Sequence, residues 1–407
     1  MKGLVKIIFA LCFLLWKIDG LDNGLAKLPP MGWMSWERFM CNIDCVNYPN
    51  DCISENLIKS TADALVKYGF KEAGYKYVSI DDCWLEMKRD HSGQLVANRT
   101  RFPSGIPALA DYLHNKDLKF GIYQDPGNMT CQRYPGSWGH IDQDAKTFAN
   151  WKVDMLKFDG CFMPSKSAYN HVYIDMKKAL NATGRHILYF CEWPSYVSQV
   201  DMRLVAETCN AFRTYNDIED EWTSIHQTMK FLGDHSRTLS NITGPGKWND
   251  PDQLVIGNFG LSFNQEKLQM ALWCIVSAPL YISADVRQMN KASRDILLNK
   301  LAISINQDPL GKMGYQIRVD GQVRVWRKEI SPVGSYALAI TYENIAGGPK
   351  RISYKLSDLG FVWRARWNFT EVFEGKSFGY GIYKPWYTLN GEVNPTGVLF
   401  LHAQVLP

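Results

Sequence analysis

The feature that most constrains the fold is a regular alternation of short apolar runs and longer helical patterns from Lys27 to about Lys312. Stretches such as 54–70 and 264–278 carry apolar residues at helical spacing between those runs. Alternating strands and helices indicate a parallel sheet, and eight repeats favour a (β/α)8 barrel. A doubly wound sheet is the alternative, but no G-x-G-x-x-G follows the first strand. The eight predicted strands lie within 31–36, 76–82, 119–125, 153–160, 187–193, 211–217, 246–252 and 279–285.

The pattern changes after residue 312. Residues 313–407 carry short alternating runs separated by Gly, Pro and Asn, and no long helical pattern. Alternation with a period of two predicts strands with one buried face, so we expect an antiparallel β-sandwich. The predicted fold class is therefore α/β, with a TIM barrel over 21–312 and a sandwich over 313–407. The predicted sandwich strands lie at 323–330, 336–343, 351–356 and 396–405.

Residues 1–20 have the pattern of a secretory signal peptide. Lys2 and Lys6 precede an apolar run at 7–16, and Gly20 is a small residue before the expected cleavage. That run is about half of the ~20 residues that a membrane span requires, so no integral membrane segment is expected. Lys and Arg total 45 against 41 Asp and Glu, without a basic tract, so nucleic acid is not an expected partner.

Cysteines and glycosylation sequons agree with the secretory pathway. Cys12 leaves with the signal and Cys274 stands apart in an apolar stretch, which leaves eight cysteines for up to four disulfides. A zinc site is the alternative, but no C-x2-C pair exists and the histidines are scattered, so no metal is expected. The eight are Cys41, Cys45, Cys52, Cys83, Cys131, Cys161, Cys191 and Cys209, and the sequons lie at Asn98, Asn128, Asn181, Asn241 and Asn368.

Carboxylates follow the predicted barrel strands. An aspartate after a strand often caps the next helix, but carboxylates at seven of the eight strand ends favour a functional site, because barrel active sites lie at those ends. Carboxylates together with aromatic side chains are what a carbohydrate site requires. The residues are Asp81, Asp82, Asp125, Asp159, Glu192, Asp217, Asp250, Asp252 and Asp285, with the aromatic residues Trp36, Trp84, Tyr123, Trp193, Tyr196 and Trp248.

Two of these carboxylates suit glycoside cleavage, which uses one group to attack and one to protonate the leaving oxygen. Asp159 is the nucleophile candidate, because Lys157 points the same way from its strand and would keep the carboxylate ionised. Asp217 suits the acid/base role, with Arg213 four residues earlier. A structural salt bridge is an equally good interpretation of each pair by spacing alone.

Motifs of other enzyme classes lack their context. The segment GKSFG at 375–379 matches G-x-S-x-G, but no helical pattern follows it, as a nucleophile elbow requires. The G-K-S within it lacks the glycine five residues earlier that a P-loop needs, and there is no H-E-x-x-H. An α/β-hydrolase or a kinase is therefore not expected.

Long motifs follow one another in a fixed order along the chain. They are MGWMSWERFMCNIDC, YVSIDDCW, KFGIYQDPGNMTC, VDMLKFDGC, ILYFCEWPSY, FRTYNDIEDEW and GPGKWNDPDQLVIGNFG. Together they resemble the lysosomal α-galactosidases and α-N-acetylgalactosaminidases of glycoside hydrolase family 27. The resemblance is close from Leu21 to about Tyr315 and loose in the C-terminal part, where NPTGVLFL matches.

The resemblance implies a retaining exo-glycosidase that removes terminal α-linked galactose from glycolipids, glycoproteins or oligosaccharides. It implies a homodimer without a cofactor, lysosomal or secreted. The nucleophile is the Asp of K-F-D-G, Asp159, and the acid/base is Asp217. The implied galactose contacts are Trp36, Asp81, Asp82, Tyr123, Lys157, Glu192, Tyr196, Arg213 and Asp252, and the implied disulfides are Cys41–Cys83, Cys45–Cys52, Cys131–Cys161 and Cys191–Cys209.

Two positions depart from the family pattern. Gln253 replaces the Met that usually follows P-D, and Ser195 stands where galactosidases have Leu and N-acetylgalactosaminidases have Ala. With Glu192, which is typical of galactosidases, Ser195 makes a mixed specificity pair. Galactose is the expected sugar, and an α-N-acetylgalactosaminidase or a dual-specificity enzyme is the alternative. A non-catalytic sugar-binding protein is not expected, because both catalytic carboxylates are present.

Overall fold

The eight predicted barrel strands are confirmed. The computed structural model describes residues 23–362 and 365–407, so the predicted signal peptide lies outside the described residues. The parallel strands are hydrogen-bonded in the order β7-β6-β5-β4-β3-β2-β1-β8, and a parallel bridge from Leu254, after β7, to Ile282 in β8 completes the ring. They are β1 (Met31–Met34), β2 (Tyr77–Ile80), β3 (Lys119–Gln124), β4 (Met155–Phe158), β5 (Leu188–Cys191), β6 (Ala211–Arg213), β7 (Trp248–Asp250) and β8 (Leu280–Ile282).

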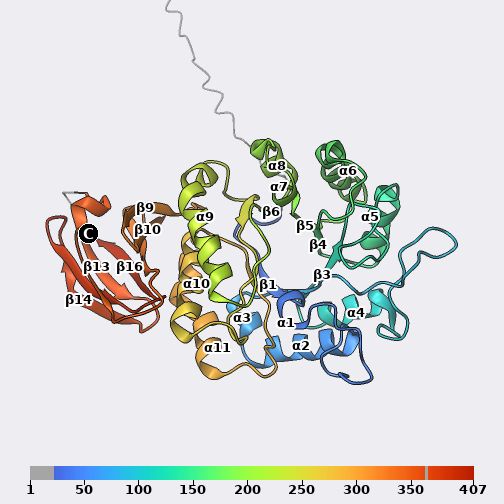
Figure 1. Cartoon of the computed structure of the whole chain (residues 1–407), viewed down its shortest axis with the longest axis horizontal. Coiled ribbons are helices and arrows are strands. Elements are labelled where there is room, and N and C mark those ends of the chain that lie inside the picture. The colour runs from blue at the N-terminus through green and yellow to red at the C-terminus, as the bar shows by residue number, and fades with distance from the viewer. Residues whose placement is uncertain (1–22, 363–364) are drawn as a thin grey trace, which may run out of the picture.

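Helices surround this sheet (Figure 1). Their starts and buried faces follow from local sequence: in α2, for example, the Ser54 hydroxyl accepts the Leu57 N–H, and Leu57, Ile58 and Leu65 face the core. The helices are α1 (Trp36–Phe39), α2 (Glu55–Lys67), α3 (Phe70–Ala73), α4 (Gly105–His114), α5 (Ile141–Asn150), α6 (Tyr169–Ala182), α7 (Trp193–Tyr196), α8 (Met202–Thr208), α9 (Trp222–Ser240), α10 (Phe263–Ile275), α11 (Lys291–Leu297) and α12 (Lys300–Asn306).

Helix α10 joins the two parts of the chain. Its residues from Leu268 to Ile275 are all buried, because the barrel covers one side and strands of the C-terminal sheets cover the other (Figure 1). A helix covered on both sides needs apolar residues all round, which explains the continuous apolar run there.

The C-terminal part consists of antiparallel sheets, as predicted. One sheet has the order β14-β13-β16-β11-β10-β9 and the other pairs β12 with β15. The predicted boundary at residue 312 falls in the connection between α12 and β9. The strands are β9 (Tyr315–Asp320), β10 (Val323–Ile330), β11 (Ser335–Tyr342), β12 (Lys350–Lys355), β13 (Arg366–Glu371), β14 (Lys376–Tyr383), β15 (Thr388–Val393) and β16 (Val398–Leu406).

Four of these strands coincide with the predicted runs, and β9, β13, β14 and β15 do not. Strand β9 lies at a sheet edge without a fully buried residue, and β15 buries only Leu389 and Val393, so neither leaves a clear apolar pattern. The segment GKSFG enters β14, and no helix follows it before β15. Its context is therefore not that of a nucleophile elbow.

The four disulfides pair as the resemblance implies: Cys41–Cys83, Cys45–Cys52, Cys131–Cys161 and Cys191–Cys209. Two of them, Cys41–Cys83 and Cys131–Cys161, join segments that follow neighbouring barrel strands, whereas Cys191–Cys209 joins the last residue of β5 to the residue after α8. The Cys131–Cys161 bridge ties the loop after β3 to the loop after β4.

Cys274 is a free, fully buried thiol in α10, and we expect it to resist alkylation in the native protein. Burial raises the pKa of the thiol to about 12, so the reactive thiolate is scarce at neutral pH. Iodoacetamide should not modify Cys274 in the native protein and should modify it once the protein is denatured. The mass of the intact protein measures the number of labels in each case. Rapid labelling without denaturant would show an exposed thiol and contradict the disulfide pairing.

Among the sequon residues, Asn128, Asn181 and Asn241 are exposed, whereas Asn98 and Asn368 are half-buried. None of the helices in the described part of the chain is both long and apolar enough to cross a membrane.

Candidate active site

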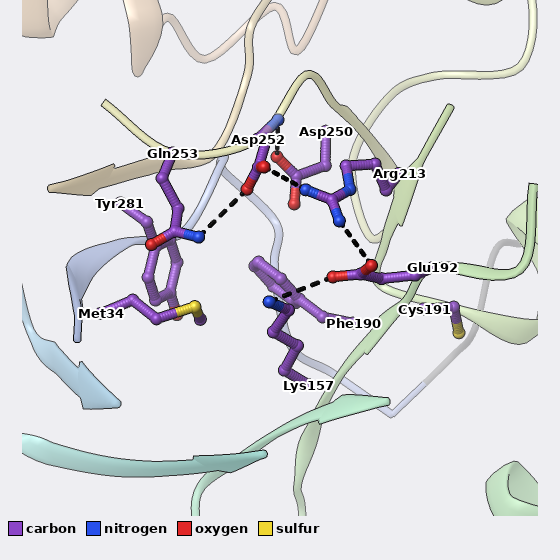
Figure 2. Close-up of a pocket in the computed structure, with 10 residues that line it drawn as sticks. All are labelled: Met34, Lys157, Phe190, Cys191, Glu192, Arg213, Asp250, Asp252, Gln253 and Tyr281. Atoms are coloured by element: carbon purple, nitrogen blue, oxygen red, sulfur yellow. Dashed lines mark hydrogen bonds and ion pairs between the residues drawn. The ribbon is translucent and has the colours of Figure 1, made fainter. Parts of the chain in front are cut away.

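Two connected spaces lie where the barrel strands end. The outer pocket is a hollow of about 190 Å³, partly open to solvent, and the inner cavity, of about 20 Å³, lies deeper, against Met34, Phe190 and Tyr281 of the barrel interior (Figure 2). Lys157, Arg213, Asp252 and Gln253 line both. The remaining residues of the outer pocket are Trp36, Asp81, Asp82, Tyr123, Cys131, Gln132, Asp159, Cys161, Tyr196 and Asp217.

Asp159 lies directly after β4 and accepts two short hydrogen bonds from phenols. Tyr123 donates at 2.6 Å to one carboxylate oxygen and Tyr196 donates at 2.7 Å to the other. Burial, together with the Asp159 charge, raises the pKa of both phenols, so they stay protonated as donors. The two bonds fix the plane of the carboxylate in the pocket.

Lys157 pairs with carboxylates other than Asp159. Its Nζ lies 2.8 Å from Asp81 and 3.2 Å from Glu192, and no ion pair joins it to Asp159 in the described part of the chain, so the interpretation of Lys157 and Asp159 as a structural salt bridge is wrong. The expected effect of the ammonium on the ionisation of Asp159 stays a prediction. Lys157 and Asp159 do share the outer pocket, as their alternating positions require. Asp81 follows β2 and Glu192 follows β5, and the ammonium between them satisfies two buried charges that would otherwise repel each other.

Arg213, the last residue of β6, connects three carboxylates. It forms ion pairs with Glu192, with Asp252 and, at 2.6 Å, with Asp217. Although burial opposes ionisation, Arg213 and Lys157 leave the pKa of Asp252 lowered. Burial raises the pKa of Glu192 to about 7 despite the same two cations. The site therefore holds a fixed anion at Asp252 and a more easily protonated group at Glu192.

Asp217 lies at the mouth of the outer pocket with its side chain 73% exposed. Arg213 lowers the pKa of this carboxyl, but partial desolvation at the mouth of the pocket and the charges of Glu192 and Asp252 outweigh that effect and raise the pKa. Solvent at the exposed face screens part of these interactions. A raised pKa keeps more of the group in the acid form that can donate a proton.

The structure brings most of the predicted contacts into one pocket, with two exceptions. Glu192 faces the inner cavity, below the outer pocket (Figure 2). Ser195, in α7, donates its hydroxyl to the main-chain oxygens of Arg213 and Tyr215, each at 3.2 Å, and so turns toward the loop after β6. The sequence missed Gln132, which follows Cys131 and carries no chemical signal of its own.

Several strand-end residues do not serve the pocket. Trp84, Trp193 and Trp248 are fully buried: Trp84 donates to Tyr123 O, Trp193 stacks on Tyr173, and Trp248 donates to Ala26 O. They are core residues, so the prediction that they form sugar platforms is wrong.

Two aspartates at strand ends have structural partners. Asp285 forms a two-point ion pair with Arg287, away from the pocket. Asp125 accepts the N–H groups of Gly127 and Cys161 and thereby connects the loops after β3 and β4. These two aspartates are therefore structural, but neither is the predicted helix cap, because the residues that precede α5 and α11 are His140 and Asn290.

Four residues of the described part of the chain lie close enough together to be considered as metal ligands. They are Asp125, Asp159, Cys131 and Cys161. The two sulfurs are joined in a disulfide and offer no thiolate, so the residues do not fit a metal ion.

Two protein-family profiles match this chain, one over the barrel and one over the C-terminal sheets. The profile of the family described as "Alpha galactosidase A" matches residues 28–308, and that of the "Alpha galactosidase A C-terminal beta sandwich domain" matches 311–397. The chain is 44% identical to human alpha-galactosidase A, over 96% of this chain and 92% of the relative. It is 46% identical to human alpha-N-acetylgalactosaminidase, over 87% of each.

Solved structures agree on the fold. Alpha-galactosidase I from Mortierella vinacea superposes with a TM-score of 0.84 at 28% identity, covering 94% of this chain and 98% of that one. Alpha-galactosidase from Saccharomyces cerevisiae with raffinose gives a TM-score of 0.85 at 26% identity, covering 95% of this chain and all of that one.

Proposed function

Because this chain belongs to the alpha-galactosidase A family of glycoside hydrolases, we propose that it removes terminal α-linked galactose with Asp159 as nucleophile and Asp217 as acid/base. The observation that carries this assignment is the contrast between the two carboxylates of the outer pocket. Asp159 is buried and accepts two phenol hydrogen bonds, which stabilise an anion, whereas Asp217 lies exposed at the mouth of the pocket, where a leaving group departs, and its pKa is raised. Two carboxyl groups with opposite environments divide into nucleophile and acid.

The reaction proceeds in two displacements. A carboxylate oxygen of Asp159 forms a bond to the anomeric carbon as the glycosidic C–O bond breaks, and Asp217 gives its proton to the leaving oxygen. Asp217, now a carboxylate, takes a proton from a water that attacks the same carbon, and the ester to Asp159 breaks. Two inversions retain the stereochemistry, and the carboxyl groups supply all of the chemistry, so no cofactor is required.

The other groups of the pocket suit a monosaccharide. Asp81, Asp82 and Asp252 offer acceptors for sugar hydroxyls, and Lys157 and Arg213 offer donors. Trp36 and Tyr123 present aromatic surface to the C–H face of the ring. Burial raises the pKa of Asp82 to about 6, although it accepts the N–H groups of Gln132 and Cys83.

The overall sequence identity does not show whether the sugar is galactose or N-acetylgalactosamine, because a galactosidase matches at 44% and an N-acetylgalactosaminidase at 46%. The family resemblance places positions 192 and 195 next to the 2-substituent of the sugar, so these two residues are expected to decide the preference. Glu192 is held by Lys157 and Arg213 and suits a 2-hydroxyl donor, which an acetamide would replace. Ser195 is small and its hydroxyl faces the main chain. The bulk that a leucine at this position would place against an N-acetyl group is therefore partly missing.

We therefore expect kcat/KM for an α-galactoside to exceed that for the matching α-GalNAc glycoside, with detectable activity on the second. Glu192→Ser should move the ratio toward GalNAc about tenfold or more, because it removes a carboxylate and opens space. Chromogenic substrates that differ only at C2 measure this. Ser195→Ala is the matched control and should change the ratio little. If the native protein cleaves α-GalNAc at least as well, the alternative, an α-N-acetylgalactosaminidase or dual-specificity enzyme, is correct.

The proposal extends to the cellular setting. Four disulfides and exposed sequons support maturation in the secretory pathway, with a lysosomal or extracellular destination. Substrates would be terminal α-galactosides of glycolipids, glycoproteins or oligosaccharides. A homodimer is part of the same proposal, on the strength of the family resemblance, and light scattering of the purified glycoprotein would test it.

A further inference from the structure

Gln253 lies between the outer pocket and the inner cavity, directly after Asp252. It is 3% exposed, and its Nε2 donates to Asp252 Oδ1 at 3.2 Å (Figure 2). Within the described part of the chain, its Oε1 is buried without a hydrogen-bond partner. An unpaired buried carbonyl oxygen costs stability, so an apolar side chain of similar size would fit this place at lower cost.

The main chain at this position is fixed without the Gln253 side chain. Asp252 has a φ of 77°, in the left-handed region that a non-glycine residue adopts at a cost. Helix α10 holds it there: Trp273 donates to Asp252 O at 2.7 Å and Gln269 donates to Gln253 O at 3.1 Å. Because these donors hold the backbone, the amide of Gln253 is left to act on the Asp252 carboxylate.

That carboxylate connects to the candidate acid/base from two sides. Its Oδ2 accepts the Ile218 N–H at 2.9 Å, one residue after Asp217, and also pairs with Arg213. Arg213 in turn binds Asp217. The orientation of Asp252 therefore affects both the charge near Asp217 and the main chain that carries it.

We propose that Gln253 is a positioning residue that holds the Asp252 carboxylate against Arg213 and the Ile218 amide, and thereby sets the acid strength of Asp217. The inference rests on the proposed acid/base role of Asp217. The charged or titratable groups that face Asp252 are Glu37 in α1, Lys157 in β4, Glu192 after β5, Arg213 in β6, Asp217 after β6, and Asp250 in β7.

The direction of the pH effect follows from these contacts. The Asp252 charge raises the pKa of Asp217, against the opposing effect of Arg213. A looser or protonated Asp252 would let the pKa of Asp217 fall. Since Asp217 must carry a proton to assist departure of the leaving group, the basic limb of the kcat/KM profile should then move to lower pH.

The test compares Gln253→Met and Gln253→Glu with the native enzyme. We expect the Met variant to lose about tenfold in kcat/KM, the lower end of the effect of a hydrogen bond to a charged group because this bond is long, and to show the acidward shift of the basic limb. Its Tm should be unchanged or higher, because the unpaired oxygen is gone. The Glu variant should approach native kcat/KM at acid pH, where its protonated carboxyl donates to Asp252. At higher pH that carboxyl ionises, and kcat/KM of the variant should fall more steeply than that of the native enzyme.

Gln307→Met is the matched control. Gln307 donates to Pro29 O at 2.8 Å, ahead of β1 at the opposite end of the barrel. This variant should lose stability and keep the native pH profile.

A Gln253→Met enzyme with native kcat/KM and pH profile, or with activity that falls only in step with Tm, would overturn the positioning role. A native enzyme inactive on every α-galactoside but active on α-GalNAc would instead overturn the substrate assignment, and the same comparison would be made on that sugar.

Discussion

Replacing Asp159 with Asn is expected to lower turnover of an α-galactoside by about four orders of magnitude or more while the fold persists. An amide does not form the glycosyl ester, and no other carboxylate of the pocket is held by two phenol donors. The Asn side chain also offers one acceptor where Tyr123 and Tyr196 now find two, so one phenol would face an NH2 group. Initial rates with a chromogenic substrate and a circular-dichroism melt measure both parts.

Asp285→Asn is the matched control for that variant. Asp285 also ends a barrel strand, but its partner is Arg287 and it lies outside the pocket. This change should lower Tm and leave turnover close to native. Substantial hydrolysis by the Asp159 variant, with retained stereochemistry, would place the nucleophile at another residue.

For Asp217→Asn, the expected loss depends on the leaving group. Protonation by a positioned acid contributes about 10²- to 10⁴-fold, so that loss is expected for a sugar or alkyl leaving group, which departs poorly as an anion. A nitrophenyl leaving group needs little protonation, so the rate of the first displacement should fall far less with this substrate. Azide, which needs no general base, should then restore turnover by attacking the glycosyl-enzyme. Pre-steady-state and steady-state rates on the two substrate types, with and without azide, measure this.

The exposed neighbour Glu219 provides the comparison for Asp217. It lies two residues later on the same loop and does not line the outer pocket. Glu219→Gln should leave both substrates and the azide response unchanged. Equal losses on all leaving groups by Asp217→Asn, without azide rescue, would argue for a binding role and against an acid/base role.

The sequence carried the architecture because a barrel repeats one simple pattern. Short apolar runs that are buried on both faces alternate with helices that need one apolar side, and both patterns are local. The same locality explains the misses in the C-terminal part. An edge strand such as β9 buries little, so its residues follow no strict period and its existence depends on the neighbour β10 that it pairs with.

Sequence reasoning also proposed both candidate catalytic carboxylates, because strand ends map to one rim, and the structure brings Asp159 and Asp217 into one pocket. It misjudged the tryptophans of that rim. A strand-end position does not say whether a side chain points to the pocket or to the surrounding helices, and Trp84, Trp193 and Trp248 point to the core. Periodicity within strands of three or four residues is too short to settle that direction.

What the sequence by itself determined is therefore the order of the barrel elements, the rim where the candidate site lies, and the residue types available there. Only the tertiary structure decided which charge pairs with which. Lys157 reaches Asp81 and Glu192 rather than Asp159, and Arg213 joins Glu192, Asp217 and Asp252. Each partner comes from a different strand or loop, so the pairing depends on the register and closure of the whole barrel, and no local stretch of sequence encodes those distances.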